Sequence, residues 1–331
     1  MTEDILTKLK KNEIRTVSRL MSLIENGQSD SEEIMNMLYA HAQQAIRIGV
    51  TGPPGAGKST LSDGLIKEFR SEGKTVGVIT VDPTSPFSGG AFLGDRIRMN
   101  KHSLDEGVFI RSMGSRGYMG GLARTSHYLA DIIACTGKDY ILFETVGVGQ
   151  AEVEIVENVD ITIVILVPES GDEIQVIKAG LVEIGDIFIV NKSDREGANR
   201  ITQLINDYLE KTSLDKEFIP EVIQTVATEG RGIKELFHQC NKLLQQFKNS
   251  GTFKLRRLEQ YKTRVRNAVR EELEKYFWTK EKEALFQKEL MYLKQDNLSP
   301  IKAARQLIKN IATSPRHVGG DELKENWNNA P

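Results

Sequence analysis

Cysteine is scarce in this sequence: Cys135 and Cys240 are the only two among 331 residues. So few cysteines, placed so far apart, exclude a disulfide scaffold and a zinc cluster built on cysteine ligands. The five histidines form no H-x-H or H-x3-H pair, and no C-x-x-C occurs. These absences argue against the clustered ligands that nickel or cobalt binding needs.

Long hydrophobic runs and a charge excess are also missing. The longest apolar run, Ile161 to Val167, holds seven residues with Thr162 inside it, far below the ~20 that a membrane helix needs. The N-terminus is charged and has no apolar core of the signal-peptide kind. A net charge of −2 argues against a general nucleic-acid binder. We therefore expect a cytoplasmic protein, or one from a reducing organelle matrix if a transit peptide was removed, with neither membrane nor nucleic acid as a partner.

Helical patterns flank the chain at both ends. Apolar spacings near 3.6 predict one amphipathic helix over residues 2–26, and Ser29 with Glu32 three residues later predicts the start of a second. Together they form an N-terminal helical extension over residues 1–45. Residues 251–331 are predicted to form a C-terminal helical arm: the pattern is helical over 254–295, Ser299 is the N-cap of a late short helix, and the final stretch is expected to be loose. This C-terminal part carries a net charge of +6, against −8 for the remainder. We interpret it as a solvated helical arm, with contact to an acidic partner as the alternative.

Short apolar runs alternate with helical stretches over residues 46–250. Seven of the runs are predicted to be strands: 46–50, 75–81, 107–113, 140–145, 161–167, 187–192 and 221–227. Their near-continuous hydrophobicity is typical of strands covered on both faces, and the helices between most of them imply right-handed crossovers. The predicted fold class is α/β, with a doubly wound, mostly parallel sheet.

A phosphate-binding motif follows the first predicted strand. GPPGAGKS satisfies G-x-x-x-x-G-K-[ST] and lies between a strand and a helix, as its mechanism requires. The glycines let backbone N–H groups surround a phosphate, and the helix adds the positive end of its dipole. We expect Lys58 to reach the β- and γ-phosphates of a nucleoside triphosphate, and Ser59 to bind magnesium. The predicted nucleotide-binding residues here are Gly52, Pro53, Pro54, Gly55, Ala56, Gly57, Lys58, Ser59 and Thr60.

A base-recognition motif follows the sixth predicted strand. Asn191, Lys192 and Asp194 form N-K-x-D, which looks like the guanine-recognition motif of G proteins. A carboxylate pairs with the N1–H and N2–H₂ donors of guanine, whereas adenine would leave it desolvated without a partner. The serine usual in the third base-contacting element is absent, because Val226-Ala227-Thr228 stands there. We expect its backbone to contact the base oxygen.

Three acids are candidate magnesium ligands and catalytic residues, together with Lys58. Asp82 and Glu144 end predicted strands, and Asp95 lies 13 residues after Asp82. Such oxygen ligands suit magnesium. Val148 stands where many G proteins carry a water-orienting glutamine, so we expect slow intrinsic hydrolysis unless a partner, Asp82, Asp95 or Gln150 completes the site.

Several longer strings resemble one family, the MeaB/ArgK methylmalonyl-CoA mutase-associated GTPases of the SIMIBI class of P-loop proteins. These strings are GVTGPPGAGKST, VDPTSPFSGGAFLGDRIRM, FIRSMGSRGYMGGLA, FETVGVGQAE and VNKSD, and the match runs from about residue 46 to 235. The resemblance implies a homodimeric GTPase that chaperones an adenosylcobalamin-dependent acyl-CoA mutase, gating its cofactor loading and protecting it. It also implies magnesium ligation by Asp82, Asp95 and Glu144, an additional switch over residues 167–180, and a dimerisation arm from about residue 251.

Three alternatives stay open at this point. A metallochaperone GTPase of the same class would deliver nickel or cobalt, but the histidine and cysteine patterns do not favour it. A kinase that phosphorylates a transport protein would need an acceptor beside the γ-phosphate, which no feature of the sequence supplies. A scaffold that binds nucleotide without turnover is disfavoured by the intact Lys58, Ser59 and Glu144.

Overall fold

The computed structural model describes residues 2–25, 31–82, 102, 104–114, 121–145, 158–168, 181–212, 218–295 and 298–313. The chain divides into two compact units, Met1–Gln260 and Tyr261–Pro331. Within the described residues, no helix is both long and apolar enough to cross a membrane.

A seven-stranded sheet forms the centre of the first unit, and all its paired strands are parallel. The strand order is β3-β2-β4-β1-β5-β6-β7. The strands are β1 (Ile46–Thr51), β2 (Val76–Asp82), β3 (Val108–Gly114), β4 (Tyr140–Glu144), β5 (Ile161–Leu166), β6 (Ile187–Asn191) and β7 (Glu221–Thr225). Each of the seven predicted strands is confirmed, and so is the doubly wound α/β class. The strand order reverses beside β1, where ligands of such sheets bind at the carboxyl ends.

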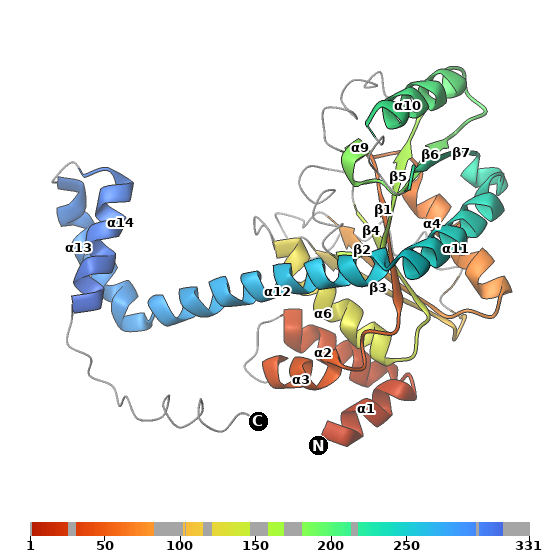
Figure 1. Cartoon of the computed structure of the whole chain (residues 1–331). Coiled ribbons are helices and arrows are strands. Elements are labelled where there is room, and N and C mark those ends of the chain that lie inside the picture. Colours follow the sequence, from red (N-terminus) through yellow and green to blue (C-terminus); the bar gives the residue numbers. More distant parts are fainter. Residues whose placement is uncertain are drawn as a thin grey trace. The chain divides into compact units, whose positions relative to one another are not determined.

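Helices cover both faces of the sheet (Figure 1). On one face, α4 (Lys58–Ser71) and α11 (Ile233–Ser250) pack against alternate side chains of the strands, for example Leu65 and Leu236 with Ile163. On the other face lie α6 (Gly121–Cys135), packed with Phe143, and α10 (Ala198–Thr212), packed with Phe188. A short helix, α9 (Leu181–Ile184), contributes Val182 next to α10. Burial on both faces explains why the strands are apolar at nearly every position.

The N-terminal extension packs on α6 as three helices: α1 (Thr2–Lys10), α2 (Ile14–Glu25) and α3 (Ser31–Tyr39). The prediction of a single helix over residues 2–26 is therefore wrong. Asn12 adopts a left-handed conformation, with φ of 53°, and its N–H donates to the carbonyl of Leu9. Asparagine tolerates this conformation, which ends a helix. The proposed capping residue Ser29 lies outside the described residues.

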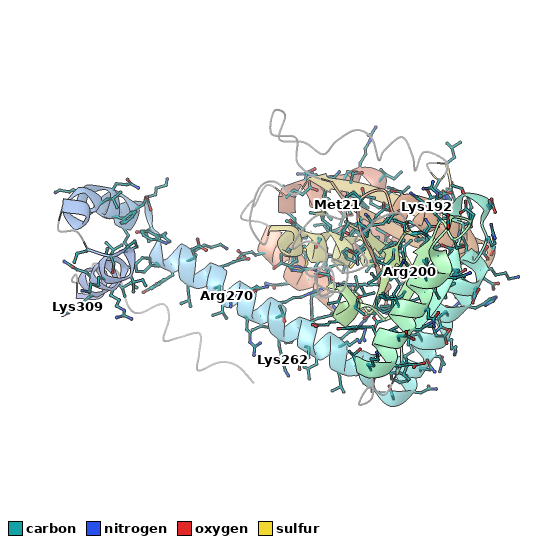
Figure 2. The ribbon with its side chains drawn as sticks, turned by 90° about the horizontal axis from the view of Figure 1, so that it is seen from above. Met21, Lys192, Arg200, Lys262, Arg270 and Lys309 are labelled. Carbon is teal, nitrogen blue, oxygen red and sulfur yellow. The ribbon has the colours of Figure 1, made fainter. Side chains whose placement is uncertain are left out.

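Over the described part of the chain after Gly251, the structure has three helices: α12 (Thr252–Phe277), α13 (Lys280–Gln295) and α14 (Pro300–Thr313). Figure 2 labels Lys262 and Arg270 on α12 and Lys309 on α14. The Ser299 cap is confirmed, because its hydroxyl accepts from Lys302 N–H at 3.4 Å.

The first turns of α12 belong to the sheet unit. Arg257 donates to both carboxylate oxygens of Asp160 over 2.9 Å, and Arg256 donates to both oxygens of Asp186 over 2.7 and 2.6 Å. Asp160 and Asp186 lie just before β5 and β6. These two arginines of the basic arm are therefore held by ion pairs and are not simply solvated.

Candidate functional site

The phosphate-binding loop connects β1 to α4 at the point where the strand order reverses. Gly52 has φ of 142°, and a Cβ there would collide with the carbonyl oxygen of Ile165. Only glycine fits this close approach of two backbones. The buried Lys58 ammonium donates to the carbonyl oxygens of Gly52 and Pro53 over 2.7 and 2.9 Å. The lysine that should bind phosphate thus lies folded over the loop that would surround it.

Asn191 joins the phosphate loop to the base-recognition loop. Its buried side-chain N–H₂ donates to the Ala56 carbonyl over 2.7 Å. Its Oδ1 atom accepts from Thr225 Oγ1 at 3.0 Å and from the Ala227 N–H at 3.1 Å. Gly57, with φ of 91°, leaves room for this amide, since a Cβ would collide with Asn191 Nδ2. The ends of β1, β6 and β7 are therefore held together by one side chain.

Two of the predicted magnesium-binding residues meet directly. The Ser59 hydroxyl donates to Oε1 of Glu144, whose side chain is buried at the end of β4. Beside them, Thr145 Oγ1 donates to Thr51 Oγ1 over 3.1 Å. A hydroxyl and a carboxylate brought together at the phosphate loop are the hard oxygen donors that suit Mg²⁺. The residues present therefore fit this ion.

A cavity of about 500 Å³ unites the phosphate and base loops. Its lining residues come from the phosphate loop, the end of β4 and the turns that follow β6 and β7: Pro54, Gly55, Gly57, Lys58, Ser59, Thr60, Glu144, Thr145, Asn191, Lys192, Asp194, Arg195, Val226, Ala227 and Thr228. Residues that are up to 174 positions apart in the chain thus face one space of a size that suits a nucleotide.

At the base end of the cavity, the chain turns sharply after β6. Lys192 has a left-handed backbone, with φ of 56°, and its carbonyl accepts from the Arg195 N–H at 3.0 Å. Asp194 lies within this turn and is exposed. Arg195 lines the same cavity, although the sequence analysis did not single it out. Its position directly after the N-K-x-D aspartate is the signal that could have identified it.

The third base element, Val226, Ala227 and Thr228, lines the cavity. Val226 is buried and its N–H donates to the Arg231 carbonyl over 3.1 Å. The Ala227 N–H, the backbone donor expected to serve the base oxygen, donates to Asn191 Oδ1 in this structure, and its contact with a base stays a prediction. Thr228 lies in the following short 3-10 helix, η4 (Ala227–Glu229), and lines the cavity.

Other predicted residues lie at the edge of the described chain or beyond it. Asp82 ends β2, where its backbone is in register with Gly114, and its side chain is not among those described. Asp95, Gln150 and most of the proposed switch at 167–180 lie outside the described residues. Their roles stay predictions.

Comparisons with known proteins identify the family and support the fold. The model of the family described as "Methylmalonyl Co-A mutase-associated GTPase MeaB" matches residues 17–282. A relative from Pyrococcus abyssi is 42% identical over 330 residues, 98% of this chain and 100% of that protein. GTPase ArgK of Escherichia coli is 33% identical over 319 residues, 93% of this chain and 96% of that protein. A crystal structure of an LAO/AO transport system kinase, 27% identical, covers 94% of this chain and 98% of that one with a TM-score of 0.70.

Proposed function

This chain belongs to the MeaB family of methylmalonyl-CoA mutase-associated GTPases, and from that premise we propose that it binds and hydrolyses GTP in the cavity between its phosphate and base loops. One observation carries the proposal: Lys58, Glu144 and Asp194 line the same cavity although they come from three separate parts of the chain.

Each lining residue has a chemical task in this proposal. Lys58 exchanges its two backbone carbonyls for the β- and γ-phosphate oxygens. The exposed carboxylate of Asp194 accepts from N1–H and N2–H₂ of guanine, and the stem of Lys192 lies along the base. Catalysis of phosphoryl transfer is mostly positioning and charge stabilisation. We expect slow turnover, because Val148 stands at the position of the usual water-orienting glutamine.

Mg²⁺ is the cofactor that we propose for this site. Ser59 and Glu144 would hold it, with Asp82 and Asp95 as the further candidates. Bound Mg²⁺ neutralises charge that develops on the phosphates. The contact between the Ser59 hydroxyl and Glu144 supports the proposal, because it brings two oxygen ligands to the phosphate loop.

The partner that we propose is an adenosylcobalamin-dependent acyl-CoA mutase, methylmalonyl-CoA mutase before others. GTP binding and hydrolysis would gate cofactor loading of the mutase and protect it. The support is the family description, which names that mutase. We further propose a homodimer with α12 to α14 as its dimerisation arm, and a cytoplasmic location.

Turnover of GTP tests this function, with ATP as the control nucleotide and with or without purified methylmalonyl-CoA mutase. We expect slow hydrolysis of GTP alone, faster hydrolysis with the mutase, and none of ATP. Lys58→Ala should abolish turnover, while Lys67→Ala, an exposed lysine of the same helix, should not change it. GTP hydrolysis that ignores the mutase contradicts the chaperone proposal, and a preference for ATP contradicts the site itself.

The alternatives receive no comparable support. Within the described residues, no group of three or more histidine, cysteine or acidic side chains forms a metal-binding cluster, so nothing there favours metal delivery. Phosphorylation of a transport protein would require transfer of labelled γ-phosphate to a purified acceptor, and the described residues indicate no acceptor position.

A further inference from the structure

We infer that Arg195 reads the O6 and N7 edge of guanine and so contributes to the choice of GTP over ATP. This inference rests on the proposed function, since it assumes that the base lies beside Asp194. It assigns a specificity-determining role to a residue outside the recognised motifs.

Guanine presents acceptors as well as donors beside Asp194. Asp194 satisfies the two donors of guanine, N1–H and N2–H₂, but the neighbouring O6 atom is an acceptor that needs a donor of its own. The Ala227 N–H can serve O6, although in this structure it donates to Asn191 Oδ1 over 3.1 Å, and N7 is a second acceptor next to O6. Two adjacent acceptors of guanine would therefore face this end of the cavity, and a side chain with more than one donor is the group that would serve both.

Arg195 lies at the base end of the cavity. It closes a hydrogen-bonded turn with Lys192, N–H to carbonyl at 3.0 Å, so residues 192 and 195 lie close together at the two ends of that turn. Asp194, between them, lines the cavity together with both. The Arg195 side chain is thus attached next to the carboxylate that would read the base.

An arginine side chain suits the acceptor edge of guanine. A guanidinium has five N–H donors and no acceptor, so it cannot pair with the donor groups that Asp194 reads. It pairs well with two adjacent acceptors, and O6 and N7 of guanine are such a pair. Adenine presents an amino donor at the O6 position, which would face the guanidinium with like polarity. The same arginine therefore favours guanine and disfavours adenine.

Nucleotide affinities measured by calorimetry on the full chain test this role. The ligands are GDP, 7-deaza-GDP, which lacks the N7 acceptor, 6-thio-GDP, whose sulfur is a weak acceptor, and ADP. We expect Arg195→Ala to bind GDP about tenfold more weakly, the scale of one bidentate arginine–guanine contact. Wild type should bind both analogues more weakly than GDP, whereas the variant should bind all three with similar affinity. The preference of the variant for GDP over ADP should also be smaller than that of the wild type.

Two further variants sharpen the test. Arg195→Lys, which keeps one charged donor, should still discriminate against 6-thio-GDP but no longer against 7-deaza-GDP. Arg200→Ala is the matched control, because Arg200 is exposed on α10 (Ala198–Thr212) and is not one of the lining residues. Figure 2 labels it together with Lys192.

The inference is overturned if Arg195→Ala binds GDP as tightly as the wild type does. It is also overturned if the variant keeps the full penalty against the analogues, or if it loses the same factor of affinity for GDP and for ADP, as a phosphate contact would produce. An Asp194→Asn variant distinguishes a failure of the proposed base site from a failure of the role given to Arg195. If that variant also leaves GDP affinity unchanged, the proposed base site fails; if it weakens GDP while Arg195→Ala does not, only the role of Arg195 fails.

Discussion

The side-chain amide nitrogen of Asn191 lies 2.7 Å from the carbonyl oxygen of Ala56 and donates a hydrogen bond to it. The first residue of the base-recognition motif therefore acts on the phosphate loop. Through its Oδ1 atom it also holds Thr225 and Ala227. The two halves of the nucleotide cavity are thus connected by a single buried side chain, and a defect in that connection should affect both.

Gly57→Ala should break this connection. The left-handed backbone costs an alanine about 1–2 kcal/mol, and the new Cβ collides with Asn191 Nδ2. Gly55→Ala is the matched control, since Gly55 has φ of 76° but nothing within 4 Å of its Cβ. Urea unfolding should show Gly57→Ala less stable than Gly55→Ala by about 1 kcal/mol, the value of one hydrogen bond. Equal losses would mean that the Asn191 contact contributes nothing.

Asp160→Asn should destabilise the first unit. The Asp160 carboxylate is 1% exposed and accepts from two nitrogens of Arg257 and from the Arg47 N–H. An asparagine amide has only one acceptor oxygen, so it cannot accept from the guanidinium through two oxygens as the carboxylate does. Breaking such a buried pair costs about 3 kcal/mol. Glu221→Gln serves as control, because its pair with Lys242 is about half exposed and should change stability by less than about 0.5 kcal/mol. Similar unfolding midpoints for both variants would refute the anchoring of α12 at this point.

The pair of Arg70 and Asp105 predicts a pH dependence. Arg70 donates to both carboxylate oxygens of Asp105 over 2.8 and 2.9 Å, and this lowers the pKa of Asp105 below its ordinary value, although partial burial opposes the shift. A lowered folded-state pKa adds stability above the unfolded value of about 3.9, and the gain is lost as the pH falls through the folded pKa. Wild type should therefore exceed Asp105→Asn in unfolding free energy at pH 7, and the difference should shrink near pH 3. A difference that stays constant over this range would contradict the shift.

Both thiols should be unreactive in the native protein. Burial is the main cause that raises the pKa of Cys135 and of Cys240 to about 12, so neither forms a thiolate near neutral pH. A disulfide reagent at pH 8 should label no cysteine in the folded chain and two after denaturation. Rapid labelling of the native protein at either position would show that the surrounding core opens.

Much of the fold follows from local patterns, and the exceptions have physical reasons. Seven apolar runs predict seven strands because parallel strands are buried on both faces, which leaves little place for polar residues. The break between α1 and α2 at Asn12 could not be predicted from the apolar spacing. A left-handed turn of three residues hardly disturbs a spacing of 3.6 between apolar residues. The ion pairs of Arg256 and Arg257 could not be predicted either, because charge alone does not reveal that these residues lie against Asp186 and Asp160.

The candidate site, too, is predictable from the sequence only in part. The phosphate loop and N-K-x-D are predictable because each motif has its chemistry in consecutive residues. That Asn191 contacts Ala56, or that Ser59 contacts Glu144, depends on strand order, which brings together the carboxyl ends of β1, β4 and β6. Arg195 follows the motif directly in the chain, which is a signal in the sequence, and the structure places it among the residues that line the cavity.

The central claim is that Asp194 reads guanine in this cavity. The most direct test compares the affinities of wild type and Asp194→Asn for GDP and for XDP, which carries a carbonyl where guanine has its 2-amino group. The carboxylate pairs with two donors of guanine, whereas an amide can donate to the xanthine carbonyl. We predict that the variant binds GDP at least about tenfold more weakly, since a hydrogen bond to a charged group is lost, and that its preference shifts toward XDP. Unchanged affinity for GDP together with unchanged discrimination against XDP would contradict the claim.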